Sequence, residues 1–262
     1  MTSPGLREQY LEAMGIPVWV QRDTADPELA ADEVQLDGAP DPESAAGEAQ
    51  LVDAGGTVSQ EAARTPGAPG TLENERDIDW SELQEAVRTC TRCALHRGRT
   101  QTVFGVGSRT ADLLIIGEAP GAEEDRRGEP FVGRAGQLLN AMLAAIQLAR
   151  EDVYISNMLK CRPPNNRDPK SDEAATCTPY LQRQIDLLQP RVILALGRIA
   201  AQWLLQSDAP IGRLRGRTFQ FGAGATPLVV SYHPAYLLRS PLAKSKSWED
   251  LKAVKRLLRI PA

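Results

Sequence analysis

The stretch RVILALGRIAAQWLLQ, residues 191–206, decides the fold because it passes directly from a strand pattern into a helix pattern. Its first part is an apolar run that ends at Gly197, as expected of a strand buried on both faces, and its second part has apolar residues at helical spacing. Similar apolar runs occur at DLLIIG (112–117), VYISN (153–157) and PLVVSYH (227–233), with helix-like stretches between them. This alternation predicts right-handed crossovers into a parallel sheet.

We therefore predict an α/β fold for residues 78–262, a three-layer domain in which helices flank a four-stranded parallel sheet. At 262 residues and 42% hydrophobic content, the chain can bury a sizeable core. The flanking helices are expected at residues 135–149, 180–188, 199–206 and 248–258. Pro179 should start or kink a helix, because proline lacks the backbone N–H that a helix interior needs.

Charge divides the chain into two unlike parts. Residues 23–77 hold fourteen acidic residues against two arginines, a net charge of -12, and are rich in Ala, Gly and Pro without any aromatic residue. This composition predicts a disordered acidic linker. Residues 78–262 hold 26 Lys and Arg against 18 Asp and Glu. That surplus of +8 suits a polyanionic partner, although an ordinary solvated surface would explain it equally well.

Residues 1–22 form a short amphipathic peptide ahead of this linker. Leu6, Tyr10, Leu11 and Met14 fall at helical spacing, and Gly15 could end the helix. Such a peptide either docks on a partner or packs on its own domain. The first residues lack the apolar segment of a secretion signal, and no later run approaches the ~20 apolar residues that span a membrane. We expect a cytoplasmic monomer that does not bind membranes.

Three polar side chains follow the predicted strands at the edge where ligands of parallel sheets bind. Glu118 follows the first strand, Asn157 ends the second, and His233 ends the fourth. Each has a structural explanation, as a turn residue, a strand-end cap or a core histidine. A carboxylate, a carboxamide and an imidazole on one edge together favour a site.

The first of these residues opens a glycine-rich loop, GEAPGAEEDRRGEPFVGRAG, residues 117–136. The loop matches neither the dinucleotide-binding pattern nor the P-loop, and its acidic run at residues 123–125 would repel phosphates. Phe131 is either a staple in the core or a flat platform for a planar ligand.

The cysteines have the spacing C-x2-C-x67-C-x15-C and are Cys90, Cys93, Cys161 and Cys177. In a chain expected in the cytoplasm, this pattern favours a metal site over disulfides. Four thiolates suit either zinc or a [4Fe-4S] cluster.

The motifs GEAPGAEEDRRGEPFVGRAGQLL, YISNMLKCRPPNNRDP, VILALG and SYHPAYLLR, with the four cysteines, resemble family 4 uracil-DNA glycosylases across residues 80–260. The resemblance implies a monofunctional enzyme that flips deoxyuridine out of single- or double-stranded DNA and hydrolyses its N-glycosidic bond. Uracil is released and an abasic site remains, as in base excision repair. It also implies a structural [4Fe-4S] cluster on the four cysteines.

Carried over by position, the resemblance assigns a catalytic role to Glu118, which would position or activate water, and to His233. It assigns substrate binding to Gly117, Ala119, Glu124, Phe131 and Asn157. Phe131 would stack on the base, and Glu124 would lie near C5, where it disfavours the methyl group of thymine. An Asn157 carboxamide can pair with O4 and N3–H of uracil, whereas cytosine presents the opposite donor and acceptor.

Contact with the DNA duplex is expected from the segment HPAYLLRSP. Leu237 or Leu238 would enter the base stack as a wedge beside Arg239, or would instead seat a short helix on the core. The basic stretches KCRPPNNR and GRLRGR could follow the phosphate backbone or shield the cluster.

Two alternative functions fit the sequence less well. A related glycosylase that becomes covalently attached to its product carries an altered first motif and an inserted basic loop, whereas GEAPG is intact here and VVSYHPAYLLR has no insertion. A non-catalytic iron-sulfur DNA-binding module would not need Glu118, Asn157 and His233 together. The peptide YLEAMGIPVWVQR resembles the tail by which the psi subunit of the bacterial clamp loader holds the chi subunit, which suggests a replication or repair partner.

Overall fold

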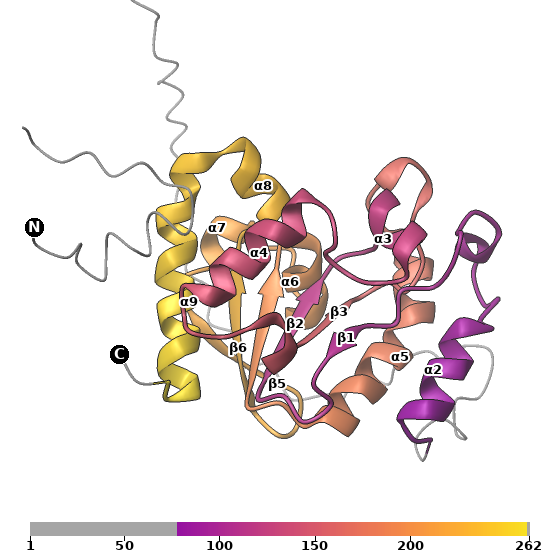
Figure 1. Cartoon of the computed structure of the whole chain (residues 1–262), viewed down its shortest axis with the longest axis horizontal. Helices are drawn as coiled ribbons and strands as arrows, with labels where there is room; N and C mark the ends of the chain where they lie inside the picture. The colour runs from indigo at the N-terminus through magenta and orange to yellow at the C-terminus, as the bar shows by residue number, and fades with distance from the viewer. Residues whose placement is uncertain (1–77, 261–262) are drawn as a thin grey trace, which may run out of the picture. The chain divides into compact units, whose positions relative to one another are not determined.

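The computed structural model describes residues 78–260 (Figure 1). The predicted amphipathic peptide at residues 1–22 and the predicted linker at residues 23–77 lie outside the described residues. Within the described part of the chain, no helix combines the length and apolar character that crossing a membrane would require.

A six-stranded sheet forms the centre of the domain, in the order β1-β3-β2-β4-β6-β5. Its four middle strands are parallel and coincide with the four predicted strands. They are β3 (Tyr154–Asn157), β2 (Leu113–Gly117), β4 (Val192–Leu196) and β6 (Thr226–Ser231). The predicted α/β class and parallel core are confirmed.

Two antiparallel edge strands bring the sheet to two strands more than the four predicted. β1 (Val106–Gly107) pairs with β3, and β5 (Thr218–Phe221) pairs with β6. β1 has only two residues, too few to give a periodic signal. β5 alternates exposed and half-buried residues at the sheet edge, so it lacks the apolar run that marks the parallel strands.

Helices cover both faces of the sheet, as the three-layer prediction required (Figure 1). Alternate strand residues point to opposite faces, so Leu113 and Ile115 pack in one core while Leu114 and Ile116 pack in the other. The first core includes α4 (Arg134–Ala144), α8 (Pro234–Arg239) and α9 (Lys244–Leu258). The second includes α5 (Ser171–Leu188), α6 (Arg198–Leu205) and α7 (Ile211–Leu214).

Helix α5 begins nine residues earlier than the predicted helix and continues through Pro179. Glu173 sets its start, because its carboxylate accepts hydrogen bonds from Lys170 N and from the guanidinium of Arg167. Of the two outcomes expected for Pro179, starting a helix is excluded, because Pro179 lies inside a helix that also contains Cys177.

The helix α2 (Trp80–Arg88) packs on α5 and builds a third, smaller core that includes cysteine side chains. Asp79 caps α2 by accepting hydrogen bonds from two backbone N–H groups of its first turn. The remaining helical segments are short and lie in connections between the larger elements. They are α3 (Ala122–Arg127), η2 (Ala94–Arg97), η3 (Arg150–Asp152), η4 (Pro164–Asn166) and η5 (Pro241–Ala243).

Candidate active site

A pocket of about 480 Å³ lies beyond the carboxyl ends of the parallel strands. β2 and β3 end at Gly117 and Asn157, which are paired in the sheet, and His233 follows β6 by two residues. The pocket is lined by seven residues that the sequence had singled out, namely Glu118, Ala119, Glu124, Phe131, Asn157, His233 and Arg239. The structure thus brings the predicted catalytic and base-contacting residues together.

The floor of the pocket depends on the absence of a side chain at Gly117. A Cβ atom there would lie 2.4 Å from Asn157 Oδ1 and 2.7 Å from Phe131 Cζ. Asn157 and Phe131 are both buried, so neither can move aside freely. Glycine therefore allows an aromatic ring and a carboxamide to share the same floor.

Phe131 adopts a left-handed backbone conformation, with φ of 52°, that is unusual for a residue with a side chain. Its carbonyl oxygen would lie only 1.7 Å from a Cβ atom at Gly136, so α4 can approach this bend only because residue 136 is glycine. Glu124 fixes the bend from the other side, since its carboxylate accepts hydrogen bonds from Val132 N, Gly133 N and Gly121 N at 3.0, 3.3 and 3.1 Å. Glu124 is thus an organiser of the loop as well as a pocket residue.

The His233 imidazole is held in one orientation at the start of α8. Its Nδ1 accepts a hydrogen bond from Ala235 N at 3.1 Å, which leaves Nε2 as the protonated nitrogen of the neutral ring. Burial, followed by the positive charge of Arg239, lowers the pKa of His233 to about 4. The ring stacks on Phe131 with 5.4 Å between centroids. His233 is therefore a neutral hydrogen-bond donor at physiological pH.

Glu118 lies half-buried just after β2, and its backbone carbonyl accepts a hydrogen bond from Leu159 N at 3.0 Å. Burial and then the negative charge of Asp168 raise the pKa of Glu118 to about 7, while Arg198 opposes them. Arg198 is paired with Asp168 at 2.8 Å. A carboxyl group that ionises near neutral pH is suited to accept a proton.

Sequence patterns missed two polar residues of the pocket, Asn166 and Asp168. Both lie in the loop after β3, where Asn165 and Asn166 occupy consecutive left-handed conformations that change the direction of the chain. The only available signal was position, because this loop follows the carboxyl end of a predicted parallel strand. Gly121, Ala135 and Ala235 also line the pocket.

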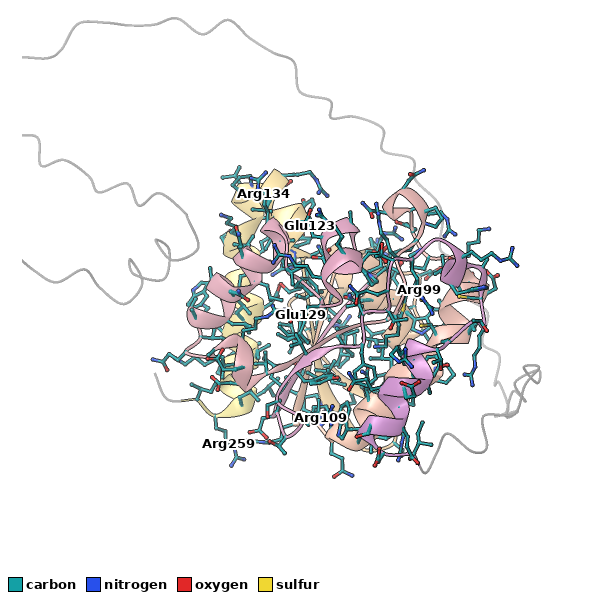
Figure 2. The ribbon with its side chains drawn as sticks, turned by 45° about the vertical axis from the view of Figure 1, so that its right-hand side comes forward. Arg99, Arg109, Glu123, Glu129, Arg134 and Arg259 are labelled. Atoms are coloured by element: carbon teal, nitrogen blue, oxygen red, sulfur yellow. The ribbon has the colours of Figure 1, made fainter. Side chains whose placement is uncertain are left out.

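A second, smaller cavity is lined by all four cysteines, which reach it from the segment that follows α2, the loop after β3 and α5. Arg99 Nη1 lies 3.0 Å from Cys161 Sγ, and Lys160 N lies 3.3 Å from Cys177 Sγ; both nitrogens donate to sulfur. Arg99 lies on the α5 side of the domain (Figure 2). Across residues 78–260, no three His, Cys, Asp or Glu side chains converge on one point as a single metal ion requires.

Helix α8 buries one of the two leucines predicted to enter DNA. Leu237 is fully buried in the first core, and Leu238 is half-buried against it. Leu237 could reach a base stack only by leaving the core, so it has the alternative role of seating α8 on the core, and Leu238 stays the candidate wedge. The large hydrophobic side chains exposed in the described part of the chain are Tyr236, at 40%, and Leu242, at 94%.

Two of the basic residues expected to follow a phosphate backbone have structural partners instead. Lys160 of KCRPPNNR is fully buried. Arg215 of GRLRGR forms an ion pair with the buried Asp250 at 2.9 Å, and its guanidinium lies over the ring of Tyr232. Of the two roles left open for these stretches, following a phosphate backbone does not suit the side chains of Lys160 and Arg215.

Comparison with known proteins relates most of the described domain to one superfamily. Residues 104–253 match the profile of the uracil DNA glycosylase superfamily. The type-4 uracil-DNA glycosylase of Archaeoglobus fulgidus is 42% identical over 182 residues, which are 67% of this chain and 92% of that protein. That of Thermotoga maritima is 43% identical over 60% of this chain and 82% of its own length. The type-5 enzyme of Thermus thermophilus is 34% identical over 50% of this chain and 68% of its own length.

Proposed function

The chain belongs to the uracil DNA glycosylase superfamily and resembles its type-4 members across their length; on this premise we propose that it excises uracil from DNA in base excision repair. The observation that carries the proposal is the pocket that gathers Glu118, Phe131, Asn157 and His233 at one sheet edge. A non-catalytic DNA-binding module would have no need of a pocket with this set of groups.

Recognition of uracil is assigned to Phe131 and Asn157. A base must leave the duplex to enter such a pocket, where its face and its edge can both be read. The Phe131 ring supplies the stacking surface, while the Asn157 carboxamide donates to O4 and accepts from N3–H. Cytosine would leave both buried amide groups unpaired, which supports strong discrimination. We assign to Glu124 a place near C5, where a methyl group would be disfavoured.

Hydrolysis is assigned to His233 and Glu118. As the bond between C1′ and N1 breaks, negative charge develops on uracil O2 and positive charge on the sugar. The neutral His233 Nε2–H can donate to O2, which stabilises the departing base more than the bound nucleotide. Ionised Glu118 can orient a water molecule and accept its proton as the hydroxyl adds to C1′.

We also propose that Cys90, Cys93, Cys161 and Cys177 hold a [4Fe-4S] cluster. Four thiols around a shared cavity, with N–H groups donating to two of the sulfurs, fit the donor set of such a cluster. A single zinc ion would also accept four thiolates, so the metal content of the purified protein decides between the two. The cluster would connect α2, the loop after β3 and α5. Absorption near 400 nm, together with four irons per chain, would test whether the cluster is present.

Contact with duplex DNA is assigned to the exposed residues around α8. Tyr236 and Arg239 line the pocket, and Leu242 follows in η5. Arg134 starts α4, which packs on α8 at the same edge of the domain (Figure 2). Apolar side chains beside arginines suit insertion between bases with phosphate anchoring.

Residues 1–22 are proposed to bind a replication or repair protein, and the enzyme to act as a cytoplasmic monomer. Pull-down of the clamp-loader chi subunit by the full chain, but not by a chain lacking residues 1–22, would support the docking role. Equal capture by both chains would refute it.

The decisive experiment uses an end-labelled oligonucleotide that contains one deoxyuridine, followed by alkali. We expect strand scission at uracil alone for the native chain, loss of scission in His233→Ala, and additional scission at cytosine in Asn157→Asp. Asn140→Asp, an identical change at an exposed position of α4, should behave as the native chain.

Absence of scission by a preparation with its full iron content would refute the proposed activity. A protein–DNA adduct that survives denaturant would then indicate the covalent relative, and reversible DNA binding without an adduct would indicate the binding module.

A further inference from the structure

Lys160 lies just after the end of β3, and its side chain is buried, so its charged group does not reach the protein surface. Its Nζ donates hydrogen bonds to Ser156 Oγ at 2.6 Å, Asn157 O at 2.9 Å and Gln184 Oε1 at 2.6 Å. Three acceptors match the three donors of a lysine ammonium group. The side chain therefore closes the turn that follows Asn157, bonding residues three and four positions before it.

The partners of Lys160 are themselves fixed. Gln184 Nε2 donates to Phe104 O at 2.9 Å and lies 3.3 Å from the hydroxyl of Tyr154. Ser156 and Gln184 are both fully buried. A buried polar network whose members are all satisfied is rigid and allows few alternative arrangements.

The segment 158–160 forms hydrogen bonds with residues beside the pocket and with a cysteine of the second cavity. Met158 N and Leu159 N donate to the carbonyls of Gly117 and Glu118 in the pocket loop. At its other end, Lys160 N donates to Cys177 Sγ, and Lys160 lines the cysteine cavity. Lys160 is thus placed between the cysteines and the floor of the pocket.

We propose that Lys160 is a positioning residue that holds Asn157 in the orientation needed to recognise uracil. The proposal rests on the proposed function. The held carbonyl and the Asn157 side chain share one Cα atom, so a shift of the carbonyl turns the carboxamide. Misplacement of a recognition group by about 1 Å can cost about 10²-fold in rate.

The test is a double-mutant cycle of Lys160→Met and Asn157→Ala, measured as single-turnover uracil excision. Methionine matches the length of lysine but donates no hydrogen bond. We expect Lys160→Met to lower kcat/KM about 10²-fold in the native background, by the same positioning argument. In the Asn157→Ala background the loss should be less than about threefold, because no carboxamide remains to be oriented. Equal losses in both backgrounds would overturn the proposal.

Matched variants protect this test against misfolding. Lys252→Met removes a partly exposed lysine paired with Glu249 and should leave kcat/KM unchanged. If Lys160→Met does not fold, Ser156→Ala and Gln184→Leu replace it in the cycle, since each removes one acceptor of Nζ. A loss of about tenfold that vanishes with Asn157→Ala would support the proposal, and an unchanged kcat/KM would refute it. Failure of the native chain to release uracil would instead refute the proposed function.

Discussion

The carboxyl group of Glu118 should give uracil excision a pH dependence near neutrality. Its pKa is raised to about 7, so the ionised form that accepts a proton increases as the pH rises through 7. We expect kcat/KM to fall about tenfold per unit below pH 7 and to level off above it. His233, with a pKa of about 4, should add no limb between pH 5 and 8.

Two charged residues near Glu118, Asp168 and Arg198, shift its pKa in opposite directions, so their replacement tests this pH dependence. Asp168→Asn removes the negative charge that raises the pKa of Glu118 and should move the limb to lower pH. Arg198→Gln removes the opposing positive charge and should move it to higher pH. Shifts in the same direction, or a flat profile from pH 5 to 8, would contradict the role given to Glu118.

The same shift predicts that Glu118→Gln stabilises the protein at alkaline pH. Below pH 4.5 the carboxyl is protonated in both folded and unfolded chains, so glutamine changes little. Between pH 4.5 and about 7 the unfolded chain ionises first, which lowers the free energy of unfolding of the native protein. At pH 8 the variant should be more stable by at most about 3 kcal/mol. Urea unfolding at pH 4.5 and 8 measures the free energy of unfolding of the variant and of the native protein. If Glu118→Gln is no more stable than the native protein at pH 8, burial of the ionised carboxylate does not destabilise the fold.

Gly117→Ala should strongly reduce activity while the fold survives. Its Cβ atom would lie 2.4 Å from Asn157 Oδ1 and 2.7 Å from the Phe131 ring, so one of these groups must leave the pocket floor. We expect a loss of kcat/KM of about 10²-fold or more. Gly212→Ala is the matched control, because a Cβ atom there has no atom within 4 Å. Comparable activity of the two variants would show that the floor tolerates a methyl group.

At the scale of elements, α8 carries a leucine in the core, Leu237, and η5 carries an exposed one, Leu242. Leu237→Ala removes a fully buried side chain and should lower the free energy of unfolding by about 2–5 kcal/mol. Leu242→Ala, at 94% exposure, should leave stability unchanged and weaken excision from double-stranded DNA several-fold, since Leu242 is proposed to enter the duplex. Activity on single-stranded DNA should not change. Equal effects of Leu242→Ala on both substrates would exclude the wedge.

The sequence predicts those elements whose signals do not depend on tertiary packing. Strands buried on both faces must be apolar throughout, so β2, β3, β4 and β6 were all predictable. Their carboxyl ends meet at one edge, which explains why Glu118, Asn157 and His233 could be grouped from their positions alone.

The sequence does not predict features that depend on how an element is oriented in the folded domain. Leu237 and Leu238 are adjacent in a six-residue helix, and only the seating of α8 on α4 decides which of them faces the core. The pocket position of Asp168 follows from the left-handed turn at Asn165 and Asn166, which no pattern indicated. Lysine is usually found at the protein surface, so its residue type predicts exposure for Lys160. It is buried because hydrogen-bond acceptors from β3 and α5 surround its ammonium group.

At the scale of the whole molecule, a segment of charge -12 at residues 23–77 is joined directly to a domain, residues 78–262, of charge +8. A tethered polyanion competes with DNA for basic residues, and this competition is screened beyond about 10 Å at 0.1 M salt. We therefore expect a chain lacking residues 1–77 to bind uracil-free duplex DNA about tenfold more tightly at low salt. Fluorescence anisotropy across a salt series should show the two binding curves converging as salt increases.

A full-length variant separates charge from bulk in this experiment. Replacing the fourteen acidic residues of 23–77 by their amides keeps the length of the segment and removes its negative charge. If the effect is electrostatic, this variant should bind uracil-free DNA as tightly as the shortened chain; if the segment obstructs DNA by its volume, it should bind as the native chain does. Because every residue of the pocket lies within 78–260, single-turnover excision at saturating enzyme should be equal in all three proteins. Equal affinities for uracil-free DNA at low salt would show that the acidic segment does not compete for the DNA-binding surface.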